Sequence, residues 1–181
     1  MASNREGKYI TSKMVKSICY QNGRTLQVLN LSFCSGLDLE SIQDITKNCV
    51  GLKNVDLSST GLSKESINFL VHNLTHEVEK LNLGRLLNLK DKHVISLSKR
   101  CNRMISLDLS RTLITDISLS SVILNLNSSL EQIDIEETKI SVDKLLVLRS
   151  IPTLIVLNHS FEDLEGGQFS GFIRKNIEIA T

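Results

Sequence analysis

The sequence predicts an α/β solenoid, a stack of short repeats with a parallel sheet on the concave side and helices on the convex side. A pattern of apolar-x-x-apolar-x-apolar recurs along the chain, and its first residues lie 26, 26, 26, 26 and 24 positions apart. The composition agrees, because 41% of the 181 residues are hydrophobic but only 4% are aromatic, so aliphatic side chains must fill the core. The six sets are Leu26/Leu29/Leu31, Leu52/Val55/Leu57, Val78/Leu81/Leu83, Met104/Leu107/Leu109, Leu130/Ile133/Ile135 and Leu154/Leu157.

Each set predicts one short strand. Its last two apolar residues are two positions apart, so both point to one face of a strand while the residues between them point to the other face. Because a polar turn and a returning helix follow each strand, neighbouring strands run parallel. This spacing is the signature of the leucine-rich repeat, and it predicts about six strands.

The segments between the strands have the periodicity of amphipathic helices, in two registers that alternate along the chain. We count positions back from the first apolar residue of the next set. One register then places apolar residues at ten, seven and three positions, and the other at eleven, eight, seven and four. We expect all of these residues in the core. The first register holds Ile42, Ile45 and Cys49, then Val94, Leu97 and Cys101. The second holds Ile67, Leu70, Val71 and Leu74, then Leu119, Val122, Ile123 and Leu126, and in part Val15, Ile18 and Cys19.

The repeat pattern divides the chain into residues 1–22, a partial repeat or cap, residues 23–160, the repeats, and residues 161–181, a C-terminal cap or tail. Without a neighbour, the first strand would expose an apolar edge, so we expect residues before Gly23 or another chain to cover it.

A column of residues stands at the turns, three positions after the last apolar residue of each set. Its side chains are predicted to form hydrogen bonds with the exposed backbone of the turn. Its members are Cys34, Thr60, Thr112, Thr138 and Ser160, and Leu86, which has no hydrogen-bonding group, departs from the column.

Composition and motifs argue against several classes of function. A net charge of +1 does not favour a nucleic-acid partner, and no apolar stretch is long enough for a membrane span or a signal peptide, so we expect a cytoplasmic or nuclear protein. The four cysteines include no C-x-x-C pair and are expected to be reduced and buried. His76-Glu77-Val78-Glu79-Lys80 lacks the second histidine of a zinc-protease helix. We therefore predict no catalytic residue, no metal and no cofactor.

Cysteine positions within the repeats carry a resemblance to a known family. Cys49-x-x-Leu52 and Cys101-x-x-Met104 precede strands, and Leu29-Asn-Leu-Ser-Phe-Cys34 closes one. Over about residues 10–160 the pattern resembles the cysteine-containing leucine-rich repeats of F-box proteins, the substrate receptors of cullin-RING ubiquitin ligases. The resemblance implies a substrate-recognition role, with a ligase adaptor and a small cyclin-kinase regulatory subunit as candidate partners. Residues 1–9 hold no counterpart of the F-box, which leaves a domain fragment, a truncated paralogue or a chain capped by a partner as alternatives.

Polar residues on the outward strand positions predict where a protein partner binds. Leucine-rich repeats present such columns on the concave face, and an aligned polar column suits an extended peptide. The alternative is that Asn and Asp simply suit an exposed sheet face, or that a partner binds the C-terminal tail. The second functional alternative is a free-standing scaffold or inhibitor. The predicted partner-binding residues are Asn30, Phe33, Asp56, Asn82, Arg85, Asp108, Arg111, Asp134, Glu136 and Asn158.

Overall fold

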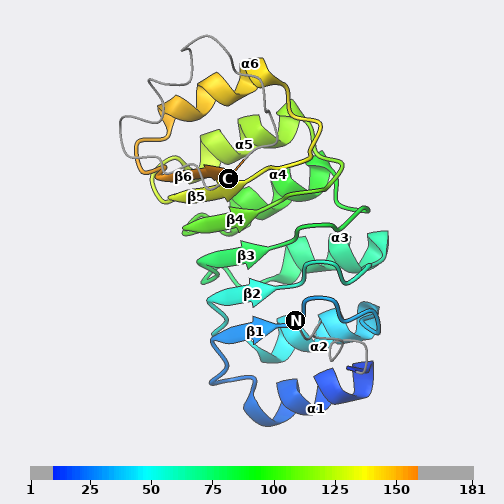
Figure 1. The fold of residues 1–181 in the computed structure, drawn as a ribbon. Coiled ribbons are helices and arrows are strands. Elements are labelled where there is room, and N and C mark those ends of the chain that lie inside the picture. Colours follow the sequence, from blue (N-terminus) through cyan, green and yellow to red (C-terminus); the bar gives the residue numbers. More distant parts are fainter. Residues whose placement is uncertain (1–9, 159–181) are drawn as a thin grey trace, which may run out of the picture.

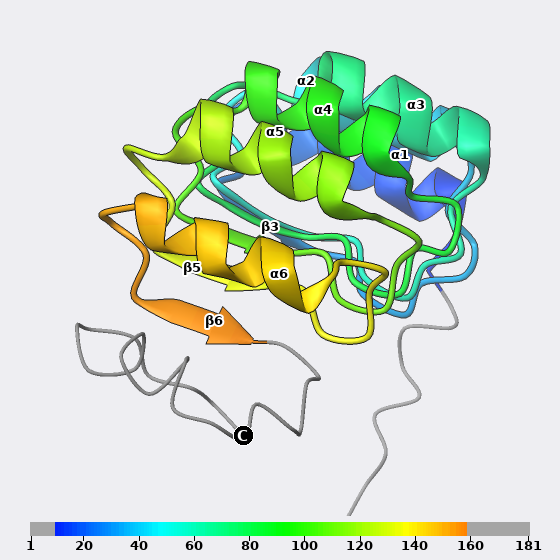
Figure 2. The ribbon, with the colours of Figure 1, turned by 90° about the horizontal axis from the view of Figure 1, so that it is seen from above.

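A computed structural model describes residues 10–158, which form one α/β solenoid (Figure 1). Six parallel strands lie in chain order in a single sheet, and the helices cover one face of this sheet (Figure 2). The predicted fold class, a leucine-rich-repeat solenoid, is confirmed. The strands are β1 (Val28–Asn30), β2 (Asn54–Asp56), β3 (Lys80–Asn82), β4 (Ser106–Asp108), β5 (Gln132–Asp134) and β6 (Val156–Asn158). The helices are α1 (Ser12–Asn22), α2 (Leu39–Asn48), α3 (Lys64–Asn73), α4 (Asp91–Arg100), α5 (Asp116–Leu126), α6 (Val142–Leu145) and the 3-10 helix η2 (Leu146–Ser150).

The strand register follows the repeat length. Leu29 pairs with Val55, Val55 with Leu81, Leu81 with Leu107 and Leu107 with Ile133. The second apolar residue of each set therefore lies beside its equivalent one repeat later, and all five of these residues are buried. A repeat of constant length therefore stacks equivalent side chains into continuous aliphatic rows, which is why so few aromatic residues are needed.

The four cysteines lie in this core, each buried and free of disulfides, in agreement with the sequence-based prediction. Cys49 and Cys101 are the residues at which α2 and α4 end, and their backbone N–H groups donate to the carbonyls of Ile45 and Leu97.

The predicted hydrogen bonds of the turn column are also confirmed where the column holds threonine. Thr60, Thr112 and Thr138 donate their hydroxyls to the carbonyl three residues earlier, at 2.6, 2.6 and 2.8 Å.

The alternation of helix registers has a cause in the turns. A helix that begins one residue earlier is rotated by about 100°, so a different set of side chains faces the sheet. The N-caps of α2 to α5 stand seven, six, seven and six positions after the last apolar residue of the preceding set. The pairs are Leu31 to Asp38, Leu57 to Ser63, Leu83 to Lys90 and Leu109 to Thr115. The turn lengths thus set the two registers.

Two sequence-based expectations at the N-terminal end need correction. Ile18 was expected in the core but is 38% exposed, and Leu26 is only half-buried. The reason is that α1 packs against α2 on one side, where it buries Val15 and Cys19, and no helix of the described residues lies on its other side. Likewise, no segment of the described residues pairs with the outer edge of β1.

The C-terminal end is shorter. The closing repeat, two residues shorter than the others, has one turn of α-helix followed by a 3-10 helix in place of a three-turn helix. The tail that the sequence assigns to residues 161–181 lies outside the described residues. None of the helices found between residues 10 and 158 has the length and apolar character needed to cross a membrane.

Candidate protein-binding site on the concave face

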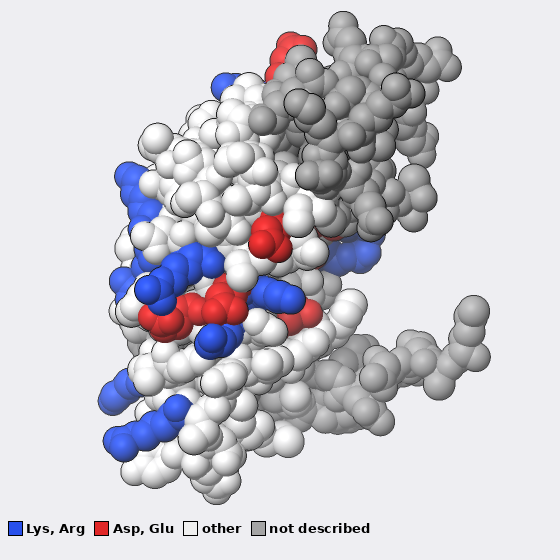
Figure 3. All heavy atoms as spheres, turned by 90° about the vertical axis from the view of Figure 1, so that its left-hand side faces the viewer, with Lys and Arg blue, Asp and Glu red and all other residues white. Residues whose placement is uncertain are grey.

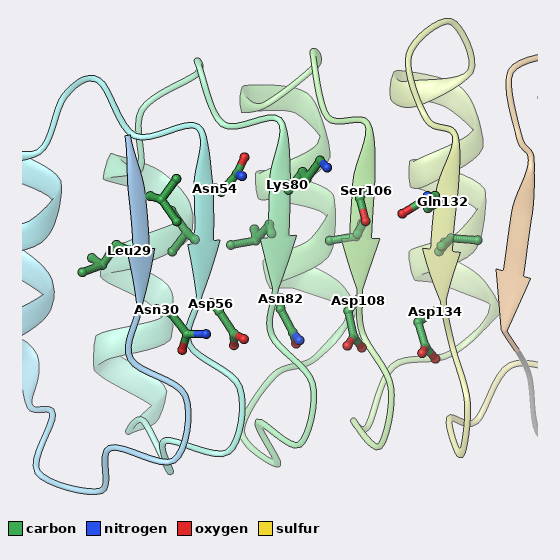
Figure 4. A pocket seen from close by; sticks show the side chains of 15 residues that line it. Leu29, Asn30, Asn54, Asp56, Lys80, Asn82, Ser106, Asp108, Gln132 and Asp134 are labelled. Atoms are coloured by element: carbon green, nitrogen blue, oxygen red, sulfur yellow. The ribbon is translucent and has the colours of Figure 1, made fainter. Parts of the chain in front are cut away.

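A shallow groove with a volume of about 400 Å³ runs across β1 to β5 on the concave face (Figure 4). Two rows of side chains line it, one at the ends of the strands and one at their starts. The row at the ends, here called the Asx row, is Asn30, Asp56, Asn82, Asp108 and Asp134. The row at the starts, here called the start row, is Val28, Asn54, Lys80, Ser106 and Gln132.

All five residues of the Asx row are among the predicted partner-binding residues, and the structure brings them together. A sixth predicted residue, Asn158, pairs in register with Asp134 at the end of β6. The start row was missed by the sequence-based prediction, although its signal was present. Residues two apart in a strand share a face, so each residue two positions before an Asx-row residue had to point into the same groove.

Each side chain of the Asx row also ends its strand. The Oδ1 atoms of Asn30, Asp56, Asn82 and Asp108 each accept a hydrogen bond of 2.9 Å from the N–H two residues later, and that of Asp134 accepts one of 3.0 Å. This is an Asx turn, which needs a side-chain oxygen at that distance from the backbone. The turn therefore explains why every repeat has Asn or Asp here, but it does not explain which of the two is present.

Asp108 has the most constrained carboxyl group of the row. Burial raises its pKa, and the nearby carboxylates of Asp134 and Asp56 raise it further, although hydrogen bonds from the N–H and hydroxyl of Ser110 oppose this. A charged carboxylate that is partly removed from water and flanked by like charges is stabilised by a cation. The middle of the groove is thus suited to a basic group of a ligand.

The flank of the groove, just beyond the strand ends, is held by an unusual backbone conformation. Phe33, Ser59, Arg85, Arg111 and Glu137 all have left-handed φ angles, between 51° and 62°. Such a conformation costs a non-glycine residue about 1–2 kcal/mol. The N–H groups of the first four continue the parallel ladder into the turn, as in the 2.9 Å bond from Phe33 to the carbonyl of Ser58. The turn therefore fixes the flank side chains in equivalent places.

Arg111 and Arg85, the two basic residues among the predicted partner-binding residues, differ in their surroundings on this flank. The guanidinium of Arg111 lies 2.8 Å from a carboxylate oxygen of Glu137 and 3.9 Å from one of Glu136. Arg85 is exposed and has no ion-pair partner among residues 10–158. At the other end of the flank, Phe33 is 62% exposed. Arg85 and Phe33 are therefore the flank side chains most open to a partner.

Another charged region lies on the edge that carries the helix-to-strand loops, where acidic and basic side chains alternate (Figure 3). Lys53 lies 3.1 Å from Glu79, and Arg103 lies 3.1 Å from Glu77. Each pair joins residues 26 positions apart, so these ion pairs connect neighbouring repeats. Within residues 10–158, no group of three or more His, Cys, Asp or Glu side chains could hold a metal ion.

Comparisons with known proteins identify the class of fold. No family model matches the chain. Rad7, in the crystal structure of its complex with Elc1 from yeast, superposes with a TM-score of 0.75 and 18% identity, over 96% of this chain and 45% of that chain. The actin-binding site 2 of leiomodin-1 (TM-score 0.52, 13% identity) matches 90% of this chain and 87% of that chain. The C-terminal domain of tropomodulin from Caenorhabditis elegans (0.53, 13%) matches 92% and 93%.

These likenesses concern the fold. The described residues are a leucine-rich-repeat solenoid, as their sheet topology and repeat register already indicate. The chain spans less than half the length of the Rad7 chain that it matches.

Proposed function

We propose that this chain is a non-catalytic protein-interaction module that binds an extended, basic segment of a partner protein in its concave groove. The observation that carries the proposal is the groove itself, lined by the carboxylates of Asp56, Asp108 and Asp134. At about 4.8 Å between strands, five strands span roughly 19 Å, the length of about six extended residues. A short linear segment laid across the strands fits this length.

Charge supports the basic character of that segment. Asp108 loses part of its hydration energy on folding, and a lysine or arginine placed over it would regain that energy through a charge-assisted hydrogen bond. Complementary charge also raises association rates and selects against acidic competitors. On the flank, Phe33 offers an aromatic contact and Arg85 a cation for an acidic or carbonyl group of the same partner, and both residue types are enriched at protein interfaces.

A narrower proposal follows from the family resemblance. The chain would be the substrate-recognition part of an F-box-type (SCF) ubiquitin ligase, and within that family the order of LQVLNLSFC, LKNVDLSST, RCNRMISLDLSRT and RSIPTLIVL resembles the S-phase kinase-associated F-box protein. Rad7, whose solenoid is similar, was crystallised in a complex with another protein, Elc1, which supports a partner-binding role for this fold. The competing proposal is a free-standing scaffold or inhibitor with no ligase attachment.

Selection of peptides tests the groove. A phage-displayed peptide library panned on the full chain is expected to yield sequences with lysine or arginine, and Asp108→Asn should weaken their binding at least tenfold. Glu65→Gln is the matched control, since it removes the same charge from an exposed residue of α3 on the convex side. Peptides without basic residues, or equal binding to Asp108→Asn and wild type, would refute the groove as the site.

The flank has its own test with the selected peptides. Arg85→Glu combined with Arg111→Glu should weaken binding while the helix content seen by circular dichroism stays unchanged. Arg85→Glu alone separates partner binding from the ion pair of Arg111 with Glu137. If binding survives both changes, the interface lies elsewhere.

Affinity purification from native cells separates the ligase proposal from the scaffold proposal. Recovery of an adaptor and a cullin in stoichiometric amounts supports the ligase. Stoichiometric recovery of other proteins, without adaptor or cullin, favours the scaffold.

A further inference from the structure

Cys19 on α1 and Cys49 at the end of α2 form a pair whose thiols are hydrogen-bonded to each other. Both residues are buried, at 1% exposure each. Cys34 and Cys101 are placed differently, because their thiols donate to backbone carbonyls at 3.7 and 3.5 Å. Two of the four cysteines are therefore in contact with each other, and two are bonded to the backbone.

The packing of the core does not require this pair. Cys19 stands seven residues before Leu26, and the equivalent residues of the two later repeats in the same helix register are Val71 and Ile123. Val71 is fully buried, so an aliphatic side chain fills this place as well as a thiol does. What distinguishes the first repeat is therefore the reactivity of its two sulfur atoms.

A close approach of two backbones brings the pair together. α1 lies beside α2 (Figure 1), and it ends at Gly23, whose N–H donates to the carbonyl of Cys19. A Cβ atom at Gly23 would lie 2.6 Å from the carbonyl oxygen of Asn48, closer than real Cβ atoms come, so only glycine lets the end of α1 rest against the residue before Cys49. Such an approach favours a disulfide, which needs its two Cα atoms within ~7 Å of each other.

A hollow beside the pair gives a small molecule access to it. The hollow has a volume of about 630 Å³, and the residues that line it include Cys19, Tyr20, Asn48 and Val50. Because the two thiols are themselves almost fully buried, a large reagent is excluded. Hydrogen peroxide, a molecule little larger than water, is not.

The hydrogen bond makes the two thiols unequal. It lowers the pKa of Cys49, whose sulfur accepts the bond, although burial opposes this. The same bond raises the pKa of Cys19, the donor, and burial raises it further. Since the thiolate is the form of cysteine that attacks an oxidant, Cys49 is the expected nucleophile and Cys19 the second thiol.

We propose that Cys19 and Cys49 are an oxidation site, at which hydrogen peroxide forms a reversible disulfide that links α1 to α2. The sulfur of Cys49 attacks one oxygen of the peroxide, the O–O bond breaks, and a sulfenic acid and one water form. The sulfur of Cys19 then attacks the sulfenic sulfur, the S–O bond breaks, and the disulfide and a second water form. Two thiols and one peroxide thus give one disulfide and two waters.

The site is free as a dithiol in the resting chain, and a small dithiol returns it to that state by exchange. The link encloses residues 20–48, a loop that contains β1 and the exposed Phe33. The pair is separate from the concave groove, and its failure would leave the peptide-binding proposal untouched.

Peptide mapping of the unaltered full chain is the first test. Trypsin separates the four cysteines into residues 17–24, 25–47, 48–53 and 101–103. Treatment of the folded chain with millimolar hydrogen peroxide, followed by alkylation in urea, is expected to join 17–24 to 48–53 and to leave Cys34 and Cys101 alkylated. Four alkylated cysteines, a different pairing, a link between two chains or a sulfinic acid at Cys49 would each overturn the proposal.

Thermal denaturation tests whether the link fits the native fold. A disulfide that joins native neighbours restricts the unfolded chain, so oxidation should raise the thermal midpoint by about 5 °C or more, and dithiothreitol should reverse the rise. Cys19→Ser and Cys49→Ser should each abolish this shift, whereas the matched controls Cys34→Ser and Cys101→Ser should keep it. An unchanged or lower midpoint of the linked wild type, or a shift that persists in Cys19→Ser, would overturn the proposal.

Discussion

Burial of His93 should make the stability of the fold depend on pH between 6.5 and 4. His93 stands three residues after the N-cap of α4, a position that Ser41, Ser66 and Ser118 fill in α2, α3 and α5. It is 1% exposed, and its Nδ1 atom accepts a 3.0 Å hydrogen bond from the N–H of Lys90. Because Nδ1 is the acceptor, Nε2 carries the proton of the neutral ring, and it has no partner among residues 10–158.

Protonation of His93 is opposed from several sides. The pKa of His93 is lowered from 6.5 to about 4, mainly by burial and also by the charges of Lys92, His72 and Lys64. A proton on Nδ1 would also set two donors against each other at the Lys90 N–H. Since the folded pKa is below the unfolded one, this contribution to stability is fully present above pH 6.5 and is lost as the pH falls to 4. At 1.36 kcal/mol per pH unit the loss is about 3 kcal/mol.

Urea denaturation of the wild type and of His93→Ser, at pH 7, 6, 5 and 4, measures this contribution. Serine restores the residue of the other repeats, and the variant keeps all carboxylates and the exposed histidines, so only the His93 contribution differs between the two pH profiles. The wild type should lose about 3 kcal/mol more than the variant over this range, out of the 5–15 kcal/mol typical of a domain. Parallel profiles would refute the assignment of a buried, neutral His93.

Three other substitutions test the fold and the groove. Leu107→Ala, in the buried row of β4, should lower the unfolding free energy by ~2–5 kcal/mol, and an unchanged melting transition would contradict the strand register. Asp91→Ala removes the carboxylate that accepts from the Thr115 N–H at 2.8 Å and the Ser118 hydroxyl at 2.6 Å. It should cost roughly 1–2 kcal/mol, with faster hydrogen exchange at the start of α5 as the readout. Asp108→Asn should raise the thermal midpoint at pH 7, because it removes a desolvated charge and leaves Oδ1 to accept from Ser110, whereas a lower midpoint would show that the carboxylate stabilises the fold.

Regular spacing made the sheet predictable from the sequence. A strand of three residues has almost no propensity signal of its own, but apolar-x-x-apolar-x-apolar repeated at 26 positions identifies which face of each strand is buried and which residues pair. The roles of Thr60 and Thr112 could be predicted for the same reason, since a threonine recurs at the same place in three repeats and donates to the carbonyl three residues earlier.

Features that depend on a neighbour in space were not readable. The pattern places Ile18 in the core, but burial at that position is supplied by the preceding repeat, which the described chain lacks. The ion pairs of Arg111 with Glu136 and Glu137 join adjacent turns. Their geometry depends on left-handed backbone angles at Arg111 and Glu137, and neither Arg nor Glu is a residue type that indicates such angles. Phe33, Arg85 and Arg111 could be named as partner-binding candidates from the sequence, but their different exposure and ion pairing could not be predicted.

The Asx row shows how one position can serve the fold and also set the charge of the groove. The turn requires a side-chain oxygen, so Asn and Asp are both acceptable to the fold, and the choice between them changes only the charge that faces the groove. Asn82 and Asp108, in adjacent strands with equivalent hydrogen bonds, demonstrate that the turn accepts either. Folding alone would favour Asn in the middle of the row, because the carboxylate of Asp108 is desolvated and repelled by Asp134 and Asp56. The turn therefore does not require carboxylates at Asp56, Asp108 and Asp134, and their presence is what the proposed binding of a basic segment would call for.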